Sequence, residues 1–265
     1  MSLYVEQVGN PEGQPLVLLH GWGMSSAIWE SWLPILEADF YILLVDLPGL
    51  GRSGYSSDQP YSLGRLAEQI LQHLEPLLSR PAIWLGWSLG GVVAAHIVVH
   101  YPECALGLIT IATNPCFVQR QDWPEAMPLE TFTSFQEALE VNALKTLNRF
   151  VMLQSQGDPE PRQLLRTLKA IVADTSRTAS MLAPSLALLA ADYRPLFASL
   201  TLPRLFLFAT EDALVPVAVV QSTLLNELAL RIDHAGHLPF ISAEPIVTMA
   251  VTGAVKCWAQ GLAHG

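Results

Sequence analysis

Short, almost uninterrupted apolar runs recur along this chain and alternate with longer amphipathic stretches. Such runs are typical of strands covered on both faces, whereas the amphipathic stretches favour helices. Because parallel strands need crossover connections, the alternation predicts right-handed βαβ units and a doubly wound, mostly parallel α/β sheet. The expected strands are PLVLLH (15–20), YILLVD (41–46), AIWLGW (82–87), LGLITIA (106–112) and RLFLFA (204–209). The expected helices span about 26–37, 62–78, 89–101, 217–225 and 242–260.

The alternation stops between about residues 115 and 190. No apolar run there has the pattern of a strand, and the segments FTSFQEALEVNALKTLNRFVMLQ and PRQLLRTLKAIVADTSRTASMLAPSLALLAA predict several helices. Turn signals at Gly157-Asp158-Pro159 and at Pro184 separate them. We therefore expect a sheet domain made of residues 1–114 and 191–265, with an all-helical cap inserted at 115–190.

Charge and cysteine content limit the other functions that are open to the chain. A formal net charge of −10 argues against a general affinity for nucleic acid or anionic lipid. The N-terminus has no signal-peptide pattern, and no apolar run reaches the roughly 20 residues of a membrane helix. Cys104, Cys116 and Cys257 have no CxxC spacing, which predicts reduced thiols in a cytoplasmic protein. No His/Cys cluster has ligand spacing, so we expect neither a metal nor an organic cofactor.

The strongest chemical motif is G-x-S-x-G, present as Gly86-Trp87-Ser88-Leu89-Gly90. It follows an expected strand and precedes an expected helix, which is the context that this motif requires. The sharp turn lifts the serine hydroxyl clear of the sheet, and the helix N-terminus favours developing negative charge. The alternative is a serine in a glycine-rich turn, but the strand–turn–helix context favours Ser88 as a nucleophile.

A serine nucleophile needs a general base, which a third group must orient. Where G-x-S-x-G forms a strand–turn–helix elbow, these residues follow in the order serine, acid, histidine. His237 lies in the loop AGHLPF, whose composition can project the ring over the edge of the sheet. His234 is the alternative base, although we expect it to complete the preceding strand. His96 and His100 lie in the helix after Ser88, where we expect structural roles.

The acid is expected after the strand at 204–209, in the segment ATEDALVP. Asp212 and Glu211 both offer a carboxylate there, and the D-x-x-V-P pattern favours Asp212, with Glu211 as its solvated neighbour. The other common acid position follows the strand at 106–112. That position offers Asn114 and no carboxylate, so Asp212 is the predicted acid.

An oxyanion hole requires two backbone N–H groups aimed at the charge that forms on the substrate carbonyl oxygen. One should belong to Leu89, directly after the nucleophile. The other should belong to Trp22 in HGWG (20–23), which follows the first long strand. The Trp22 indole can form a wall of the pocket; the alternative is a tryptophan that only closes the core.

The segments LVLLHGWGMSSAIW, VDLPGLGRSG, LGWSLGG, NPCF…DWP, RFVMLQ and AGHLPFIS together resemble the α/β-hydrolase superfamily. Within it they resemble the pimeloyl-[acyl-carrier protein] methyl ester esterase family, over residues 3–260. The combination of HGWG, GWSLGG, NPCF and RFxxLQ is much narrower than the superfamily motifs.

That resemblance implies a monomeric serine carboxylesterase of biotin synthesis. It would demethylate the pimeloyl-carrier-protein ester through an acyl-enzyme, with Ser88, Asp212 and His237 as the triad. The implied substrate contacts are Trp22, Ser88, Leu89, Phe150, Val151, Met152, Leu153, Gln154 and His237.

Other functions remain open from the sequence. The first is a generalist short-chain carboxylesterase, or a C–C bond or lactone hydrolase of the same fold; the second is a non-catalytic protein that binds a ligand in the same pocket. A dehalogenase or epoxide hydrolase is disfavoured, because those enzymes have aspartate where Ser88 stands. The loop DLPGLGRSG (46–54) lacks the GKS/T ending of a phosphate loop. We expect it to brace the edge of the active site.

Basic residues are concentrated in the expected cap. Six of the 14 in the chain fall within 145–177, against three acids: Lys145, Arg149, Arg162, Arg166, Lys169 and Arg177. Arg162 and Arg166 are i,i+4 and share a helix face. A solvated helix face is the simpler explanation, but acyl carrier proteins are strongly acidic. We therefore expect Arg149, Arg162 and Arg166 to dock the carrier and the run Phe150 to Gln154 to line the acyl channel.

Overall fold

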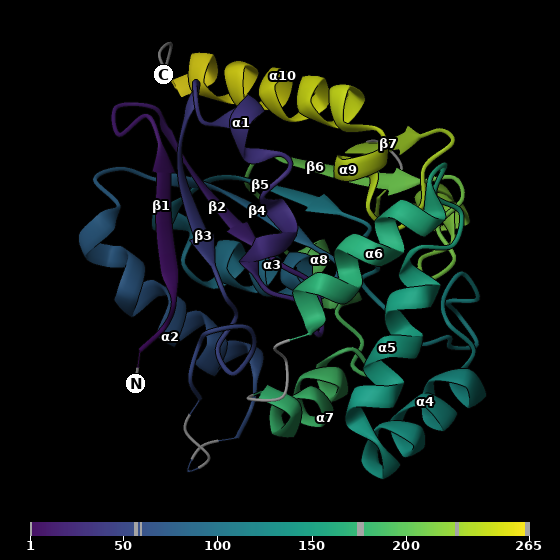
Figure 1. Ribbon diagram of the computed structural model, residues 1–265. Helices are drawn as coiled ribbons and strands as arrows, with labels where there is room; N and C mark the ends of the chain where they lie inside the picture. The colour runs from purple at the N-terminus through teal and green to yellow at the C-terminus, as the bar shows by residue number, and fades with distance from the viewer. Residues whose placement is uncertain (1, 56–57, 59, 174–177, 226–227, 263–265) are drawn as a thin grey trace.

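The computed structural model describes residues 2–55, 58, 60–173, 178–225 and 228–262. At its centre lies a seven-stranded sheet with the order β1-β3-β2-β4-β5-β6-β7 (Figure 1). Strand β1 pairs antiparallel with β3, and every other pairing is parallel. The fold is therefore the doubly wound, mostly parallel sheet that the sequence predicts.

The five predicted strands are confirmed, with ends that shift by at most about two residues. They are β2 (Gln14–Leu19), β3 (Phe40–Val45), β4 (Ala82–Trp87), β5 (Ala105–Ile111) and β6 (Arg204–Ala209). The two edge strands are β1 (Val5–Gly9), which was not predicted, and β7 (Ala229–Ile232), which was expected only as a strand of unstated bounds before His234. Both expose part of their length, so neither has the continuous apolar run that marks a strand buried on both faces.

The helices that cover the sheet agree with prediction where they are long. They include α2 (Leu63–Leu74), continued by the turn η2 (Glu75–Leu77), then α3 (Leu89–His100) and α10 (Glu244–Leu262). Shorter elements are η3 (Pro102–Cys104), α8 (Arg194–Ala198) and α9 (Pro239–Ser242). Helix α3 is almost wholly buried because it lies against β4, β5 and β2. Among the described helices, none is both long and apolar enough to cross a membrane.

Two predicted helices are wrong in form. The segment 26–37 contains a 3₁₀ turn, η1 (Ser26–Trp29), and the four-residue α1 (Leu33–Leu36). Pro34 near the start of α1 has no N–H to donate to a preceding turn, so a helix that began at residue 26 would lose a backbone hydrogen bond there. The segment 217–225 contains only the 3₁₀ turn η5 (Val217–Gln221), where three valines lower the helix propensity.

Residues 115–190, which we call the cap, lie in the chain between β5 and β6. Four helices form most of this segment: α4 (Leu129–Val141), α5 (Ala143–Gln154), α6 (Pro161–Val172) and α7 (Ala179–Leu188). They gather on one side of the sheet, at the lower right of Figure 1. The expectation of an all-helical cap is wrong for its first 14 residues. They form a loop with isolated β-bridges, such as Val118 with Met127. The expectation that Pro184 separates two helices is wrong, because this proline lies inside α7. Arg177 lies outside the described residues.

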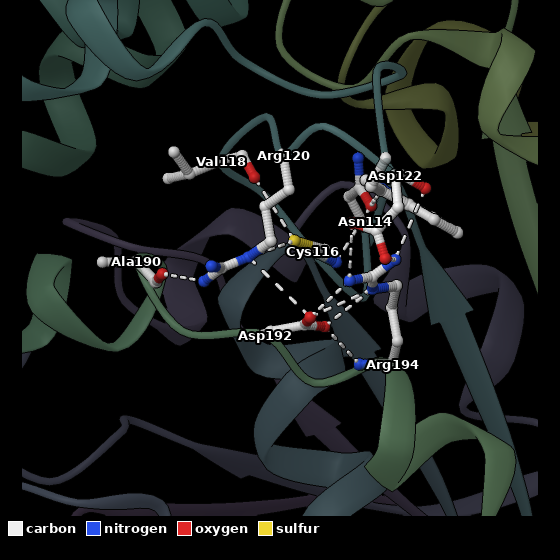
Figure 2. A network of polar contacts seen from close by, with 9 residues as sticks. Asn114, Cys116, Val118, Arg120, Asp122, Ala190, Asp192 and Arg194 are labelled. Atoms are coloured by element: carbon white, nitrogen blue, oxygen red, sulfur yellow. Dashed lines mark hydrogen bonds and ion pairs between the residues drawn. The ribbon is translucent and has the colours of Figure 1, made fainter.

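The two ends of the cap are held together by a network of charged side chains (Figure 2). Arg194 bonds Asp192 at 2.6 Å and Asp122 at 2.9 Å. Arg120 lies 3.8 Å from the same Asp192 carboxylate and donates to the Ala190 carbonyl at 3.2 Å. The hydrogen bonds from Arg194 hold the pKa of Asp192 below its ordinary value. The chain therefore leaves and re-enters the sheet through a joined neck.

Candidate active site

The predicted site residues follow the carboxyl ends of parallel strands. Ser88 follows β4, the loop of Trp22 follows β2, Asp212 follows β6 and His237 follows β7. Parallel strands end at one edge of the sheet, so these loops meet there. Strands β2 and β4 are neighbours although β3 separates them in the chain. Such a switch in strand order opens a crevice in which α/β proteins bind their ligands.

The turn at Ser88 is sharp, and its glycines are required by close backbone approach. Ser88 has φ 55° and ψ −118°, a conformation that costs about 1–3 kcal/mol for a residue with a side chain. Its N–H donates to the Ile111 carbonyl at 2.9 Å. A Cβ on Gly86 would lie 2.2 Å from the Gly90 carbonyl oxygen, and one on Gly90 would lie 2.2 Å from that of Leu19. The pattern therefore reflects steric needs of the turn as well as chemistry.

The predicted acid and base are in direct contact. His237 Nδ1 and Asp212 Oδ2 lie 2.8 Å apart, in a pair with almost no exposure. The other carboxylate oxygen, Oδ1, accepts the backbone N–H groups of Leu214 at 2.8 Å and Val215 at 3.1 Å. A carboxylate only accepts, so Nδ1 carries the proton and Nε2 presents its lone pair. The D-x-x-V-P turn thus fixes the tautomer that a general base needs.

A catalytic triad also needs a contact between His237 Nε2 and the serine hydroxyl. Among the described residues, His237 Nε2 has no hydrogen-bond partner although it is buried. Ser88 is 6% exposed. Hydrogen bonds between nucleophile and base often tighten only when substrate is bound. Transfer of the Ser88 proton to Nε2, and with it the triad, stays a prediction.

The alternative residues lie elsewhere. His234 is exposed in a turn after β7 with φ 56°, so the expectation that it completes the strand is wrong. Its N–H donates to Thr210 Oγ1 at 3.1 Å. Glu211 is exposed, as expected for the solvated neighbour of Asp212. Among the described residues, no three His, Cys, Asp or Glu side chains form a group that could hold a metal ion.

Trp87, which sequence reasoning did not single out, supports the base. Its indole Nε1 donates to the His237 carbonyl at 2.9 Å, and the two rings lie 5.3 Å apart. The bond spans 150 positions of sequence, so no local signal could have revealed it. Trp87 thus joins the turn of the predicted nucleophile, Ser88, to the loop of the predicted base, His237.

His20 anchors the segment 20–23, which carries the predicted oxyanion donor Trp22 and which we call the oxyanion loop, to the loop after β3. Its Nδ1–H donates to the Gly21 carbonyl at 2.8 Å, and its Nε2 accepts the Leu47 N–H at 2.9 Å. This pattern requires the neutral imidazole, and burial lowers the pKa of His20 in agreement. The loop 46–54 therefore braces the site at this contact, as expected.

The two predicted oxyanion donors lie on either side of the nucleophile. Leu89 is the first residue of α3, where backbone N–H groups have no partner within the helix. Trp22 is 1% exposed. The loop before Trp22 touches the nucleophile, since a Cβ on Gly21 would lie 3.3 Å from Ser88 Cβ. Both N–H groups therefore belong to segments that adjoin Ser88.

An apolar pocket of ≈ 320 Å³ lies among the cap helices, lined by residues that include Phe135, Phe150, Leu153 and Arg149. This is within the size range of small-molecule sites, near its lower end. The Trp22 ring meets Phe150 edge to face at 4.9 Å and Phe135 at 5.6 Å. The wall of the pocket thus reaches the oxyanion loop.

The predicted lining run Phe150–Gln154 divides between several environments because it is helical. Phe150 and Leu153 line the pocket, whereas Val151 is fully buried in the core. Met152 is 45% exposed and lines a neighbouring groove that shares Phe135 and Arg149 with this pocket, so its predicted contact with substrate stays a prediction. Gln154 is 1% exposed, and both polar atoms of its amide lack a partner among the described residues.

The three predicted docking arginines are exposed on the cap. Arg149 lies on α5, and Arg162 and Arg166 lie on α6. None takes part in an ion pair between described residues. Arg149 also lines the apolar pocket. Glu130 lines the same pocket, so Arg149 stands beside a carboxylate there, whereas Arg162 and Arg166 lie on a different helix.

Comparison with known proteins agrees with this fold. The family described as the alpha/beta hydrolase fold matches residues 14–244. The pimeloyl-[acyl-carrier protein] methyl ester esterase of Edwardsiella ictaluri is 41% identical over 86% of this chain and 87% of its own. That of Klebsiella pneumoniae is 38% identical over 88% and 92%.

The solved structure of an esterase from Exiguobacterium antarcticum superposes with a TM-score of 0.84. It covers 96% of this chain and 95% of its own, at 22% identity, and so supports the fold alone. The chain therefore belongs to the α/β-hydrolase family and, within it, to the pimeloyl-[acyl-carrier protein] methyl ester esterase family.

Proposed function

We propose that the chain is a serine carboxylesterase that hydrolyses the methyl ester of pimeloyl-[acyl-carrier protein] in biotin synthesis. The products are methanol and the carrier-linked free acid. Relatives about 40% identical bear this name. The observation that carries the proposal is the 2.8 Å contact of His237 Nδ1 with Asp212, at the sheet edge that also holds Ser88. This pair leaves Nε2 free to act as a base towards a serine hydroxyl.

The reaction follows from the roles of these groups. Ser88 Oγ attacks the ester carbonyl carbon while His237 Nε2 takes the hydroxyl proton. The N–H groups of Trp22 and Leu89 donate to the oxygen that becomes negatively charged. The intermediate collapses, and methoxide leaves as methanol with the proton from His237. Water then attacks the acyl-serine with the same base, which releases the acid and restores Ser88.

Recognition of the substrate is assigned to the cap. The apolar pocket beside Phe150 suits the methylene chain of the acyl group, and the unpartnered amide of Gln154 offers a donor and an acceptor at low solvent exposure. The exposed Arg149, Arg162 and Arg166 suit an acidic carrier protein. These three arginines can steer such a partner locally despite the negative net charge of the whole chain.

The test compares pimeloyl-carrier-protein methyl ester with free dimethyl pimelate. We expect a much higher kcat/KM for the carrier-linked ester, and no turnover of either ester by Ser88→Ala. Equal kcat/KM for the two esters would contradict the proposed substrate and favour a generalist carboxylesterase. Turnover that survives Ser88→Ala would remove the serine mechanism altogether.

Carrier docking is tested separately by charge reversal. The double variant Arg162→Glu/Arg166→Glu should raise KM for the carrier-linked ester and leave turnover of p-nitrophenyl butyrate intact. Arg231 and Lys256 are exposed outside the cap, so Arg231→Glu/Lys256→Glu changes the net charge equally and serves as the matched control. A similar rise in KM in both double variants would mean that only net charge matters.

We further propose that the enzyme works as a monomer in the cytoplasm. The three cysteines are free, which suits a reducing compartment. Light scattering of the purified chain measures its mass directly, and a stable dimer would contradict this part.

A further inference from the structure

The oxyanion loop depends on glycine at both sides of Trp22. A Cβ on Gly21 would lie 2.9 Å from the Trp87 ring and 3.3 Å from Ser88 Cβ, so the approach of the loop to the nucleophile leaves little room for a side chain there. Gly23 has φ +71°, and a Cβ on it would lie 2.6 Å from Leu147 Cδ1 of α5. Glycine has the most permissive backbone of all residues. The segment 21–23 therefore has little intrinsic order, and one side chain to hold it.

That side chain is anchored in the cap. The Trp22 indole Nε1 donates to the backbone carbonyl of Leu182 in α7, at 2.9 Å and across 160 positions of sequence. The ring also meets Phe150 of α5 nearly perpendicularly, at 89°, and Phe135 of α4 at 72°. Three cap helices thus contact one indole. Together these contacts restrict both side-chain torsions of Trp22.

We propose that the Trp22 indole is a positioning group: through its bond to the Leu182 carbonyl, the cap orients the Trp22 backbone N–H toward the oxyanion. The indole and the N–H are attached to the same Cα, between two glycines that do little to restrict the backbone. Without the anchored indole, the Gly21–Trp22 peptide that carries this N–H is free to rotate. Donors of an oxyanion hole are effective only when they are held in place before charge develops. The inference rests on the oxyanion role of Trp22 in the proposed function.

A simpler explanation is that a buried indole N–H needs any acceptor, and that Leu182 supplies it. The two explanations differ in what loss of the bond would do. A merely structural bond contributes to stability alone. A positioning bond contributes to the transition state, so its loss lowers kcat and weakens transition-state analogues while KM stays nearly constant.

The experiment replaces Trp22 with 3-benzothienylalanine, which keeps the bicyclic shape and substitutes sulfur for the N–H. Turnover of p-nitrophenyl butyrate and inhibition by butylboronic acid, which forms a tetrahedral adduct with the serine, are measured per folded molecule. We expect kcat to fall about tenfold, well short of the loss of a whole oxyanion donor. KM should stay within about twofold, and boronate affinity should fall in proportion to kcat/KM.

Trp32 is the matched control. It is fully buried, and its Nε1 donates to Thr248 Oγ1 at 2.7 Å. The same replacement there should lower stability and leave kcat unchanged. Trp22→Phe provides a second variant if the analogue folds poorly, with the same pattern expected.

An unchanged kcat in the folded Trp22 variants would overturn the inference, as would a rise in KM alone. Because the assay uses a small ester, an error in the natural substrate would leave this test informative.

Discussion

Replacing Gly157 by alanine should disturb the catalytic acid from a position in the cap. Gly157 lies in the turn between α5 and α6 with φ +76°, and a Cβ there would lie 1.8 Å from the Glu211 carbonyl oxygen. Glu211 directly precedes Asp212. The same turn touches the base loop, since a Cβ on Gly236 would lie 2.9 Å from the Gln156 carbonyl oxygen. The turn at Gly157 therefore packs closely against the backbone of the Asp212 loop and that of the His237 loop.

The magnitude follows from two costs. The left-handed conformation costs a residue with a Cβ about 1–2 kcal/mol. Ordinary contact begins near 3.4 Å, so relief of the clash requires the turn or the Glu211 peptide to move by more than an ångström. Overpacking of this kind costs about 1–3 kcal/mol. The sum, about 2–5 kcal/mol, is a large part of the roughly 5–15 kcal/mol that stabilises a domain.

Activity should fall as well. A displacement of about 1 Å at a catalytic group can cost 10²-fold in rate, so we expect kcat to drop between about tenfold and a hundredfold in molecules that remain folded. Urea denaturation gives the free energy of unfolding, and p-nitrophenyl butyrate gives kcat below room temperature, where the variant stays folded.

Gly253→Ala is the control, because nothing lies within 4 Å of a Cβ at that position. It should stabilise α10 by up to about 1 kcal/mol and leave kcat unaltered. The reasoning fails if Gly157→Ala has both the urea unfolding midpoint and the kcat of the wild type. That result would mean that the turn does not contact the acid loop closely enough to displace it.

Three other changes test separate parts of the structure. Asp212→Asn should lower kcat by about 10⁴-fold with little change in KM, because an amide no longer selects the Nδ1–H tautomer of His237; steady-state kinetics with wild-type secondary structure checks it. Burial lowers the pKa of His96 to about 4, so below pH about 6.5 the unfolded chain binds a proton that the folded chain does not, and stability falls with acid. His96→Gln should flatten this slope in urea titrations between pH 4 and 6.5, and an unchanged slope would contradict the assignment. Arg194→Met, which removes the shared partner of two neck carboxylates, should cost about 1–2 kcal/mol in urea without lowering kcat.

Sequence patterns predict the parts of this molecule that depend on local interactions. The buried strands β2 to β6 have continuous apolar runs because both faces are covered, and such runs need no partner to be recognised. The turn at Ser88 is recognisable for a similar reason: Gly86 and Gly90 are required within four positions of each other. The acid is also marked locally, since the bonds of Asp212 to Leu214 and Val215 lie inside its own turn.

Features that depend on distant contacts escaped prediction. The edge strand β1 is recognisable only through its pairing with β3, and the short elements in 26–37 share the apolar spacing of a true helix until Pro34 is considered. The indole N–H groups of Trp87 and Trp22 donate to backbone carbonyls 150 and 160 positions away in the sequence. The run that contains Met152 was treated as one surface, whereas a helix turns about 100° per residue and exposes this side chain.

The distribution of these contacts argues that the cap takes part in catalysis as well as in recognition. The sheet alone fixes the nucleophile, since Ser88 bonds to Ile111 of β5. The oxyanion loop bonds to α7 through Trp22, and the acid loop lies against the turn at Gly157. A cap that only selected substrates would change KM when perturbed. Because this cap lies against the loops of two predicted catalytic groups, the Trp22 N–H and the Asp212 carboxylate, we expect substitutions at these contacts to lower kcat even for esters too small to fill the pocket.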